Sequence, residues 1–178
     1  MNCITDLTLI ANNAEVNDIE NRAFRTYIKS HNKQQIIDTA VQKLNTEISQ
    51  QIDCTTCGNC CNSLMINVTD AECKVVSSKL NMDANAFNKK YIETSTEGAM
   101  VINTIPCHFL HEKKCSIYEQ RFDDCRAFPH LHKPDFYTRV GGTLMYYGIC
   151  PIIYNVIEQL KVVLGFKLSD CANTNDPL

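Results

Sequence analysis

The sequence predicts a mainly α-helical protein with short β segments, a small irregular domain stapled by metal and preceded by N-terminal amphipathic helices. Three observations lead to this prediction. The chain has 178 residues, which suits one ordinary domain with a core of its own. Apolar residues recur at helical spacing before residue 54. The chain also holds 11 cysteines, and most of them cluster beyond that point, where no clear period is visible.

Composition excludes several classes of protein. With 44% hydrophobic and 21% charged residues, the chain is neither disordered nor of low complexity. A formal charge of -3 gives no electrostatic attraction to nucleic acid, so we expect no nucleic-acid partner. No apolar stretch approaches the roughly 18 residues of a membrane helix, so we expect no membrane span. No secretory signal is visible and the cysteine count is odd, which favours a cytoplasmic protein with metal-binding thiols over a disulfide scaffold.

Two amphipathic helices are predicted after a loose lead-in of about a dozen residues. The first stripe lies within residues 16–28 and the second within residues 36–52, and His31 and Asn32 interrupt the pattern between them. We interpret both stripes as packing faces.

Short strands and capped helices follow. Residues 64–68 and 99–102 read as short strands. Thr69 with Glu72 three residues later is typical of a capping box, which opens a helix that carries Ala71, Val75, Val76 and Leu80. Asp83 is placed to cap the next helix.

The last third of the chain has mixed patterns. Residues 106–134 are rich in cysteine and histidine without a period, which is typical of a loop held by something other than its own core. Residues 137–148 suggest a hairpin that turns at Gly141 and Gly142. Pro151 is expected at the first position of a final helix.

These elements predict three segments along one chain. Residues 1–53 form an N-terminal helical layer, residues 54–165 form the cysteine-cluster domain, and residues 166–178 form a tail.

The motif that carries chemistry is Cys54-x-x-Cys57-Gly58-x-Cys60-Cys61. Two-residue gaps let neighbouring thiolates converge on one metal ion, and a glycine lets the backbone turn around it. Adjacent cysteines in extended backbone point in different directions. Cys60 and Cys61 therefore serve two different sites, or one of them is not a ligand.

Four later cysteines bring the candidate set to eight, enough for two four-ligand sites or for one site with spares. Eight unmetallated thiolates packed together would repel one another, and cations relieve that repulsion. The candidate ligands are Cys54, Cys57, Cys60, Cys61, Cys107, Cys115, Cys125 and Cys150. Four nearby histidines could each replace a cysteine: His108, His111, His130 and His132. The remaining cysteines, Cys3, Cys73 and Cys171, are interpreted as structural or free thiols.

The motifs together resemble the CxxCxxCC cysteine-cluster family. The resemblance rests on the first motif, on Cys107-x-Phe109-Leu110, and on Cys115-x-Ile117-Tyr118-x-x-Arg121-x-x-x-Cys125-Arg126-x-Phe128-Pro129, and it covers roughly residues 54–150. The family is described as zinc- or iron-chelating, and sometimes as iron–sulfur proteins. The resemblance implies metal binding by the eight matching cysteines but no settled activity. This chain has Phe122 where the family usually has proline.

Two kinds of metal group suit these cysteines. The spacing Cys54-x-x-Cys57-x-x-Cys60, with a remote cysteine before Pro151, resembles bacterial-type iron–sulfur ligation and favours a cluster held by these three cysteines and Cys150. All-thiolate sites of four are equally good structural zinc sites. An iron–sulfur cluster is therefore the first choice and zinc the alternative.

Three residues beside the cysteines are expected to support the site. Arg121 and Arg126 could donate N–H groups to thiolate sulfurs, and Tyr118, like Phe128, is expected to pack around the site and keep it dry.

Four functions are consistent with these sequence features. The first is a metal-chelating protein that holds an iron–sulfur cluster or iron through up to eight thiolates. The second is a structural zinc module that docks an unknown protein partner through its N-terminal helices. The third, a protein-lysine-modifying enzyme or accessory, rests on analogy with flagellin lysine N-methylases, which carry a similar domain. The fourth is a thiol–disulfide oxidoreductase that uses Cys54 and Cys57.

Overall fold

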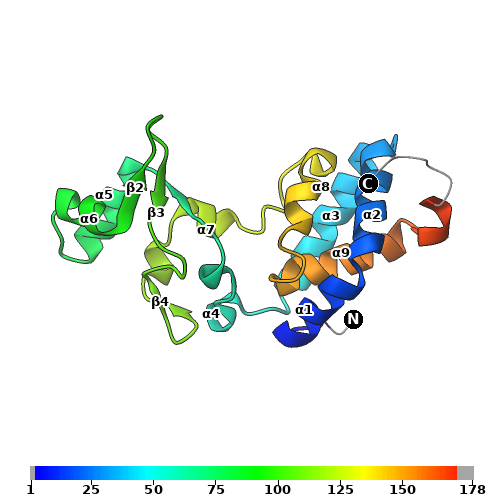
Figure 1. Cartoon of the computed structure of the whole chain (residues 1–178), viewed down its shortest axis with the longest axis horizontal. Helices are drawn as coiled ribbons and strands as arrows, with labels where there is room; N and C mark the ends of the chain where they lie inside the picture. Colours follow the sequence, from blue (N-terminus) through cyan, green and yellow to red (C-terminus); the bar gives the residue numbers. More distant parts are fainter. Residues whose placement is uncertain (1–2, 172–178) are drawn as a thin grey trace. The chain divides into compact units, whose positions relative to one another are not determined.

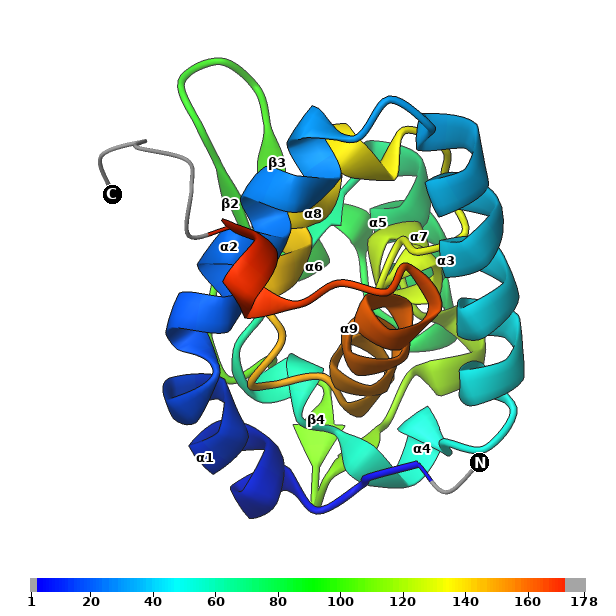
Figure 2. The same ribbon diagram turned by 90° about the vertical axis from the view of Figure 1, so that its right-hand side faces the viewer.

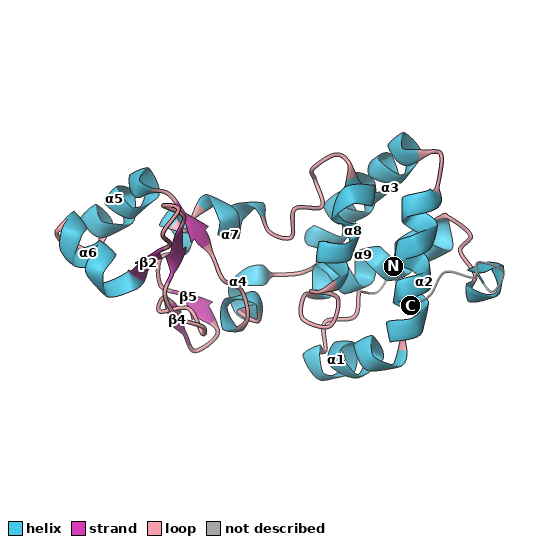
Figure 3. Ribbon diagram, turned by 45° about the horizontal axis from the view of Figure 1, so that its top comes forward, coloured by secondary structure: helices cyan, strands magenta, loops and turns pink. Residues whose placement is uncertain are grey.

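The computed structural model describes residues 3–171, and these fall into two compact units. We call Asp53–Phe128 the cysteine unit, and the described residues up to Ile52 together with those from Pro129 onward the helical unit. Nine α-helices occur within residues 3–171, with short antiparallel strands only in the cysteine unit (Figure 3). The predicted mainly helical fold class is therefore confirmed.

The helical unit is a bundle around a central helix. Its helices are α1 (Leu7–Val16), α2 (Asp18–Ser30), α3 (Gln34–Ser49), α8 (Phe136–Leu144) and α9 (Pro151–Val163), with a 3-10 turn at Leu168–Cys171 (Figure 1). Helix α9 is buried along most of its length, as expected for a helix that is apolar nearly all round. It packs against α3 and α1 (Figure 2). The predicted stripe of α3 provides the matching face with Ile37, Val41, Leu44 and Ile48.

The first helix begins earlier than the sequence predicts. The Asp6 carboxylate accepts hydrogen bonds from the backbone N–H groups of Thr8 and Leu9, and Ile10 is fully buried. An N-terminal cap and one core contact thus stabilise α1 where we expected a loose lead-in. In contrast, Val16 and Ile19, which we assigned to a packing face, are 80% and 72% exposed.

The hairpin predicted for residues 137–148 is wrong, because α8 occupies this stretch. Two backbone N–H groups at its start, from Asp135 and Phe136, each donate at 2.8 Å to the Asp38 carboxylate on α3. Gly141 faces α2, where an added Cβ would lie 3.1 Å from the Arg25 side chain. A cap from a distant helix and a close helix–helix approach therefore overrode the turn tendency of the glycines.

A buried ion-pair network joins α2 to α9. The Lys161 side chain is 6% exposed, and its Nζ lies 2.9 Å from the Glu20 carboxylate and 2.7 Å from that of Glu158. Tyr147 donates its hydroxyl to Glu158 at 2.7 Å. Burial raises the pKa of Tyr147 well above its usual range, so the hydroxyl remains a donor. The network neutralises a lysine that would otherwise be costly to bury.

The cysteine unit combines short helices with two small sheets. Its helices are α4 (Cys54–Cys57), α5 (Asp70–Lys79), α6 (Ala84–Tyr91) and α7 (Asp123–Ala127), with 3-10 turns at Cys60–Asn62 and Tyr118–Gln120. Strands β1 (Asn67–Val68), β3 (Met100–Ile102) and β2 (Ile92–Thr94) form an antiparallel sheet in that order. Strands β4 (Leu110–His111) and β5 (Lys114–Cys115) form a separate hairpin. The predicted segment 106–134 therefore contains several short elements.

The predicted caps of this unit are confirmed. The Thr69 and Glu72 side chains form the complete capping box at the start of α5. The Asp83 carboxylate accepts from the backbone N–H groups of Asn85 and Ala86 at the start of α6. The core beneath is aromatic and includes Phe87, Tyr91, Phe109 and Phe122.

The units divide the chain differently from the sequence-based segments. The described residues from Pro129 onward pack with the helical unit, because α8 and α9 bury apolar faces against α2 and α3. Phe166, in the predicted tail, is buried with its ring 5.0 Å from that of Phe24, while residues 172–178 lie outside the described part. Within residues 3–171, no helix has the length and apolar character needed to cross a membrane.

Candidate metal centre

Seven of the eight predicted ligands belong to the cysteine unit. They lie on α4, on the following 3-10 turn, before and within the β4–β5 hairpin, and on α7: Cys54, Cys57, Cys60, Cys61, Cys107, Cys115 and Cys125. The eighth, Cys150, belongs to the helical unit, where it is buried and provides the N-cap position of α9. The predicted eight thiols are thus divided between the two units.

Gly58 fixes the approach of the first motif to the hairpin. It ends α4 in the left-handed conformation, with φ of 59°. A Cβ at this position would lie 2.4 Å from the carbonyl oxygen of Lys113 at the tip of the hairpin. Only glycine allows the two backbones to approach this closely, so Gly58 holds α4 against the hairpin that carries Cys115.

The hairpin and the segment before it hold two cysteines in the same way. The N–H of Phe109 donates to the sulfur of Cys107, and the N–H of Ile117 donates to that of Cys115. Phe109 and Ile117 are themselves buried, at 4% and 3% exposure. Each cysteine is therefore followed two residues later by an apolar anchor that directs an amide donor at its sulfur. Such bonds favour the thiolate form.

Cys61 is connected to this segment through the backbone. The N–H of Cys107 donates to the carbonyl oxygen of Cys61 at 2.8 Å. A hydrogen bond with the Cys60 side chain, together with burial and the charge of Cys60, raises the pKa of Cys61 well above its usual range.

Four thiols are linked by the electrostatic effects on Cys107, Cys115 and Cys125. Burial raises the pKa of Cys125 to about 12, and the neighbouring thiols of Cys107, Cys61 and Cys115 raise it as well. Burial also raises the pKa of Cys107 and of Cys115, with contributions from Cys61 at both. We call Cys61, Cys107, Cys115 and Cys125 the thiol quartet. Its members come from the 3-10 turn, the segment before the hairpin, the hairpin itself and α7.

Cys54 is the most exposed of the seven cysteines of the cysteine unit. Burial, Cys57 and Asp53 raise its pKa, and a smaller contribution comes from Cys61. Asp53 caps α4 by accepting from the N–H and hydroxyl of Thr55 at 2.8 and 2.6 Å. The first motif thus presents Cys54 and Cys57 from a capped single turn of helix.

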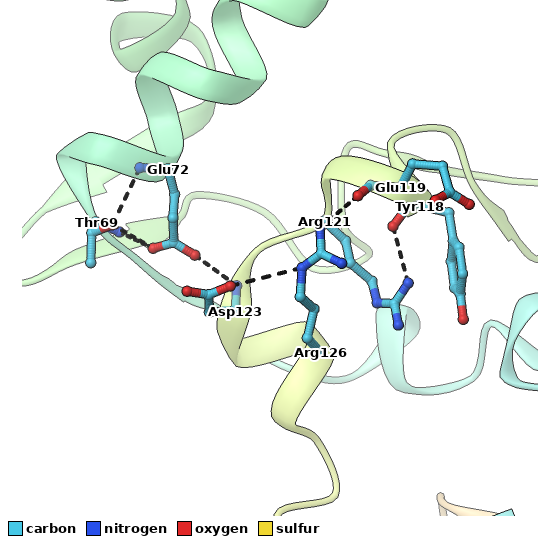
Figure 4. Close-up of polar contacts among 7 residues, drawn as sticks. All are labelled: Thr69, Glu72, Tyr118, Glu119, Arg121, Asp123 and Arg126. Carbon is cyan, nitrogen blue, oxygen red and sulfur yellow. Dashed lines mark hydrogen bonds and ion pairs between the residues drawn. The ribbon is translucent and has the colours of Figure 1, made fainter.

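The two predicted supporting arginines are placed differently. The Arg121 guanidinium lies 3.8 Å from the centre of the Tyr118 ring and donates to the Tyr118 carbonyl oxygen at 3.0 Å. Its positive charge lowers the pKa of both Cys54 and Cys115, opposing the effect of burial. Arg126 instead donates to the Glu119 carbonyl oxygen and pairs with Asp123 (Figure 4). Arg121, held on Tyr118, is the cation that acts on the thiols.

The donor chemistry fits zinc or iron. Thiol sulfur is the soft ligand that both metals accept, and the amide donors and Arg121 would offset thiolate charge. Across residues 3–171, however, no three or more cysteine, histidine, aspartate or glutamate side chains are arranged to hold a metal ion. The thiol side chains would therefore have to reorient around an incoming ion.

The histidines and remaining cysteines occupy other surroundings. His108 shares a 2.7 Å hydrogen bond with Asn103, and its ring lies 5.0 Å from that of Tyr91. His111 is exposed on β4, and His130 and His132 belong to the helical unit. Cys73 is buried in α5, where burial raises its pKa to about 11. The side chain of Cys171 lies outside the described residues.

Sequence reasoning missed the amide donors of Phe109 and Ile117. The repeated pattern of a cysteine followed two residues later by an apolar residue is the signal that could have revealed them. The departure at Phe122 has a structural explanation. Its φ of -58° suits proline, while its ring is buried 6.2 Å from that of Phe109. Phenylalanine thus keeps the backbone conformation and adds to the aromatic core.

Comparison with known proteins agrees with this donor set. Residues 53–141 match the model of the CxxCxxCC family, described as "Putative zinc- or iron-chelating domain". The comparisons with curated proteins and with solved structures found no match. The matched residues make up half of the chain and include the seven cysteines of the cysteine unit. The chain therefore belongs to the CxxCxxCC family of zinc- or iron-chelating domains.

Proposed function

We propose that this protein chelates a zinc or iron ion through the thiol quartet of Cys61, Cys107, Cys115 and Cys125. The observation that carries the proposal is that Cys61 raises the pKa of each of the other three thiols, although the four come from four different local elements. The backbone bond of 2.8 Å from the Cys107 N–H to the Cys61 carbonyl oxygen holds two of these elements together. Four thiolates complete a closed tetrahedral site, the usual arrangement for structural zinc.

The surroundings of the quartet would compensate for its charge. Four thiolates around a divalent ion carry a net charge of about -2, which is costly in a half-buried site. The N–H groups of Phe109 and Ile117 and the guanidinium of Arg121 each act on quartet sulfurs. These groups support thiolate ligation in the way that outer-shell donors tune metal sites.

Binding would convert the site from a protonated to an ionised state. Burial keeps the pKa values of Cys107, Cys115 and Cys125 raised in the metal-free chain, so these thiols carry protons at neutral pH. Each thiol that becomes a ligand loses its proton, so metal binding releases protons and draws the four elements together. The ion would therefore stabilise the cysteine unit as well as occupy it.

A second candidate is an iron–sulfur cluster on Cys54, Cys57 and Cys60. The observation that favours it is their spacing, two residues between successive cysteines, which is the bacterial iron–sulfur pattern. Cys150, followed by Pro151, is the predicted fourth ligand. This candidate uses a set of thiols separate from the quartet, so both groups can be tested independently.

The experiment is a metal and sulfide analysis of anaerobically purified full-length protein and three variants. We expect one zinc or iron ion per quartet, which Cys125→Ser should lose. Cys73→Ala is the control, because Cys73 is a buried cysteine outside both ligand sets, and this variant should retain the ion. Acid-labile sulfide that disappears in Cys57→Ser but not in Cys125→Ser would identify the cluster candidate. Wild-type metal content in Cys125→Ser would contradict the quartet.

A further inference from the structure

One carboxylate connects two helices of the cysteine unit. One oxygen of Glu72 accepts from the backbone N–H and the hydroxyl of Thr69, at 2.8 and 2.5 Å. Its other oxygen accepts from the backbone N–H of Asp123 at 2.7 Å (Figure 4). Burial alone would raise the pKa of Glu72, but these bonds from Thr69 and Asp123 hold it below its usual range. The same side chain therefore completes the capping box of α5 and reaches a residue 51 positions later in the sequence.

This contact caps helix α7, which has no side-chain cap of its own. The residue at its N-cap position is Phe122, which makes no side-chain capping bond and is buried in the aromatic core. Asp123 is the first helical residue, and its N–H is one of the groups that a helix start leaves without an internal partner. Glu72 supplies the missing acceptor from another helix.

The helix held in this way carries a member of the thiol quartet. Cys125 is the third residue of α7, two positions after the amide that Glu72 accepts from. A second bond system supports the same turn: the Asp124 carboxylate accepts from the backbone and side-chain N–H groups of Asn67 on β1, both at 3.1 Å. Both contacts attach α7 to the β1–α5 segment, whereas the other three quartet cysteines lie on the 3-10 turn and at the hairpin.

We propose that Glu72 is a positioning residue of the metal centre, which sets the location of Cys125 by capping α7 from α5. This inference rests on the proposed function of the quartet. Glu72 does not touch the metal ligands' sulfur atoms in this role; it acts through the first turn of α7. Its removal is expected to loosen the first turn of α7, and with it Cys125, although Asp124 still accepts from Asn67. Cys61, Cys107 and Cys115 are expected to stay in place.

The test compares variants that break the contact from each side. Glu72→Gln retains the shape but offers a single acceptor oxygen for donors on both Thr69 and Asp123. Asp123→Pro removes the N–H itself, and proline is tolerated at a first helical position. Asp123→Ala removes the same side chain but retains the N–H, so it is the matched control. Thr69→Ala weakens the capping box without touching the bond to α7.

Cobalt(II) provides the readout, because its thiolate charge-transfer absorption reports how many sulfurs bind the ion. We expect Glu72→Gln and Asp123→Pro to weaken cobalt affinity by up to about 10-fold, the low end of the effect of losing a direct partner of a ligand, because Glu72 acts on Cys125 only through α7. Both should also show reduced charge-transfer intensity per bound ion. Asp123→Ala and Thr69→Ala should bind within about threefold of the wild type. The double variant of Glu72→Gln and Asp123→Pro should be no weaker than either single change, because both remove one interaction.

The outcomes distinguish a failure of the role assigned to Glu72 from a failure of the thiol quartet itself. If the wild type and Cys125→Ser bind cobalt with the same affinity and spectrum, the quartet itself is wrong. If Cys125→Ser loses a thiolate but Glu72→Gln and Asp123→Pro match the wild type, the quartet stands and Glu72 is not a positioning residue. Equal weakening in Asp123→Pro and Asp123→Ala would also overturn the inference. Should Glu72→Gln fail to fold, Asp123→Pro still tests the contact with the capping box intact.

Discussion

Replacing Gly58 with alanine tests whether the close approach of α4 to the β4–β5 hairpin organises the site. Two penalties follow from the structure. Alanine at φ of 59° loses about 1–2 kcal/mol relative to glycine. Its Cβ would also meet the Lys113 carbonyl oxygen at 2.4 Å and its carbonyl carbon at 2.8 Å. These are backbone atoms that cannot rotate away, so overpacking adds about 1–3 kcal/mol. The expected loss in unfolding free energy is about 2–5 kcal/mol.

Gly98 provides a matched control within the same unit. It also has a positive φ, of 86°, but a Cβ built there meets nothing within 4 Å. Gly98→Ala should therefore incur only the backbone penalty, about 1–2 kcal/mol. The difference between the two variants isolates the steric contact between Gly58 and the hairpin.

Three measurements test this: the free energy of unfolding in urea, hydrogen exchange of peptides from the cysteine unit, and the zinc or iron content of each variant. If the clash is relieved by displacement of the hairpin, Cys115 moves with Lys113 and metal content falls in Gly58→Ala but not in Gly98→Ala. Equal destabilisation of both variants, with wild-type metal content in each, would refute the reasoning.

Three further predictions concern charge and metal in the two units. Burial raises the pKa of Cys125 to about 12 in the metal-free chain, so zinc binding must release its proton. In competition titrations the apparent zinc affinity should rise with pH between 6 and 8, about tenfold per pH unit for each proton released. An affinity that does not change with pH would count against thiol ligation. Removing the metal with a chelator should accelerate hydrogen exchange in the cysteine unit. The helical unit should retain its protection, because its core contains none of the quartet thiols. Equal loss of protection in both units would contradict this. Lys161→Ala removes the cation that pairs with the Glu20 and Glu158 carboxylates. Because the lysine is buried but each carboxylate is about a third exposed, the free energy of unfolding in urea should fall by up to about 3 kcal/mol. The control Arg22→Ala breaks an exposed pair with Asp18 and should lower the free energy of unfolding by less than about 1 kcal/mol.

Local sequence signals predicted the elements that depend on neighbouring residues. The capping box of Thr69 and Glu72, the cap at Asp83 and the first-turn proline at Pro151 all occur where the pattern indicates. Each involves residues within one helical turn, so no distant contact is needed to form it. The metal-chelating family was likewise recognisable, because its cysteines follow one another at fixed spacing.

Distant contacts decided the elements that the sequence predicted wrongly. The segment with Gly141 became a helix because Asp38, almost a hundred residues away, caps its start. Glu72 has one function that its neighbours reveal and a second, on Asp123, that only the folded chain creates. Both cases involve a carboxylate that satisfies backbone N–H groups of a remote helix, and no local pattern records such a partner.

The sequence by itself determined that this protein has a mainly helical fold and belongs to a zinc- or iron-chelating family. Helical periodicity and cysteine spacing depend only on how far apart residues lie along the chain. Only the tertiary structure decided how the thiols are grouped. It put Cys61, Cys107 and Cys115 within electrostatic influence of Cys125 and assigned Cys150 to the helical unit. The physical reason is that Coulomb interactions and desolvation depend on distance in space, which spacing along the chain does not fix.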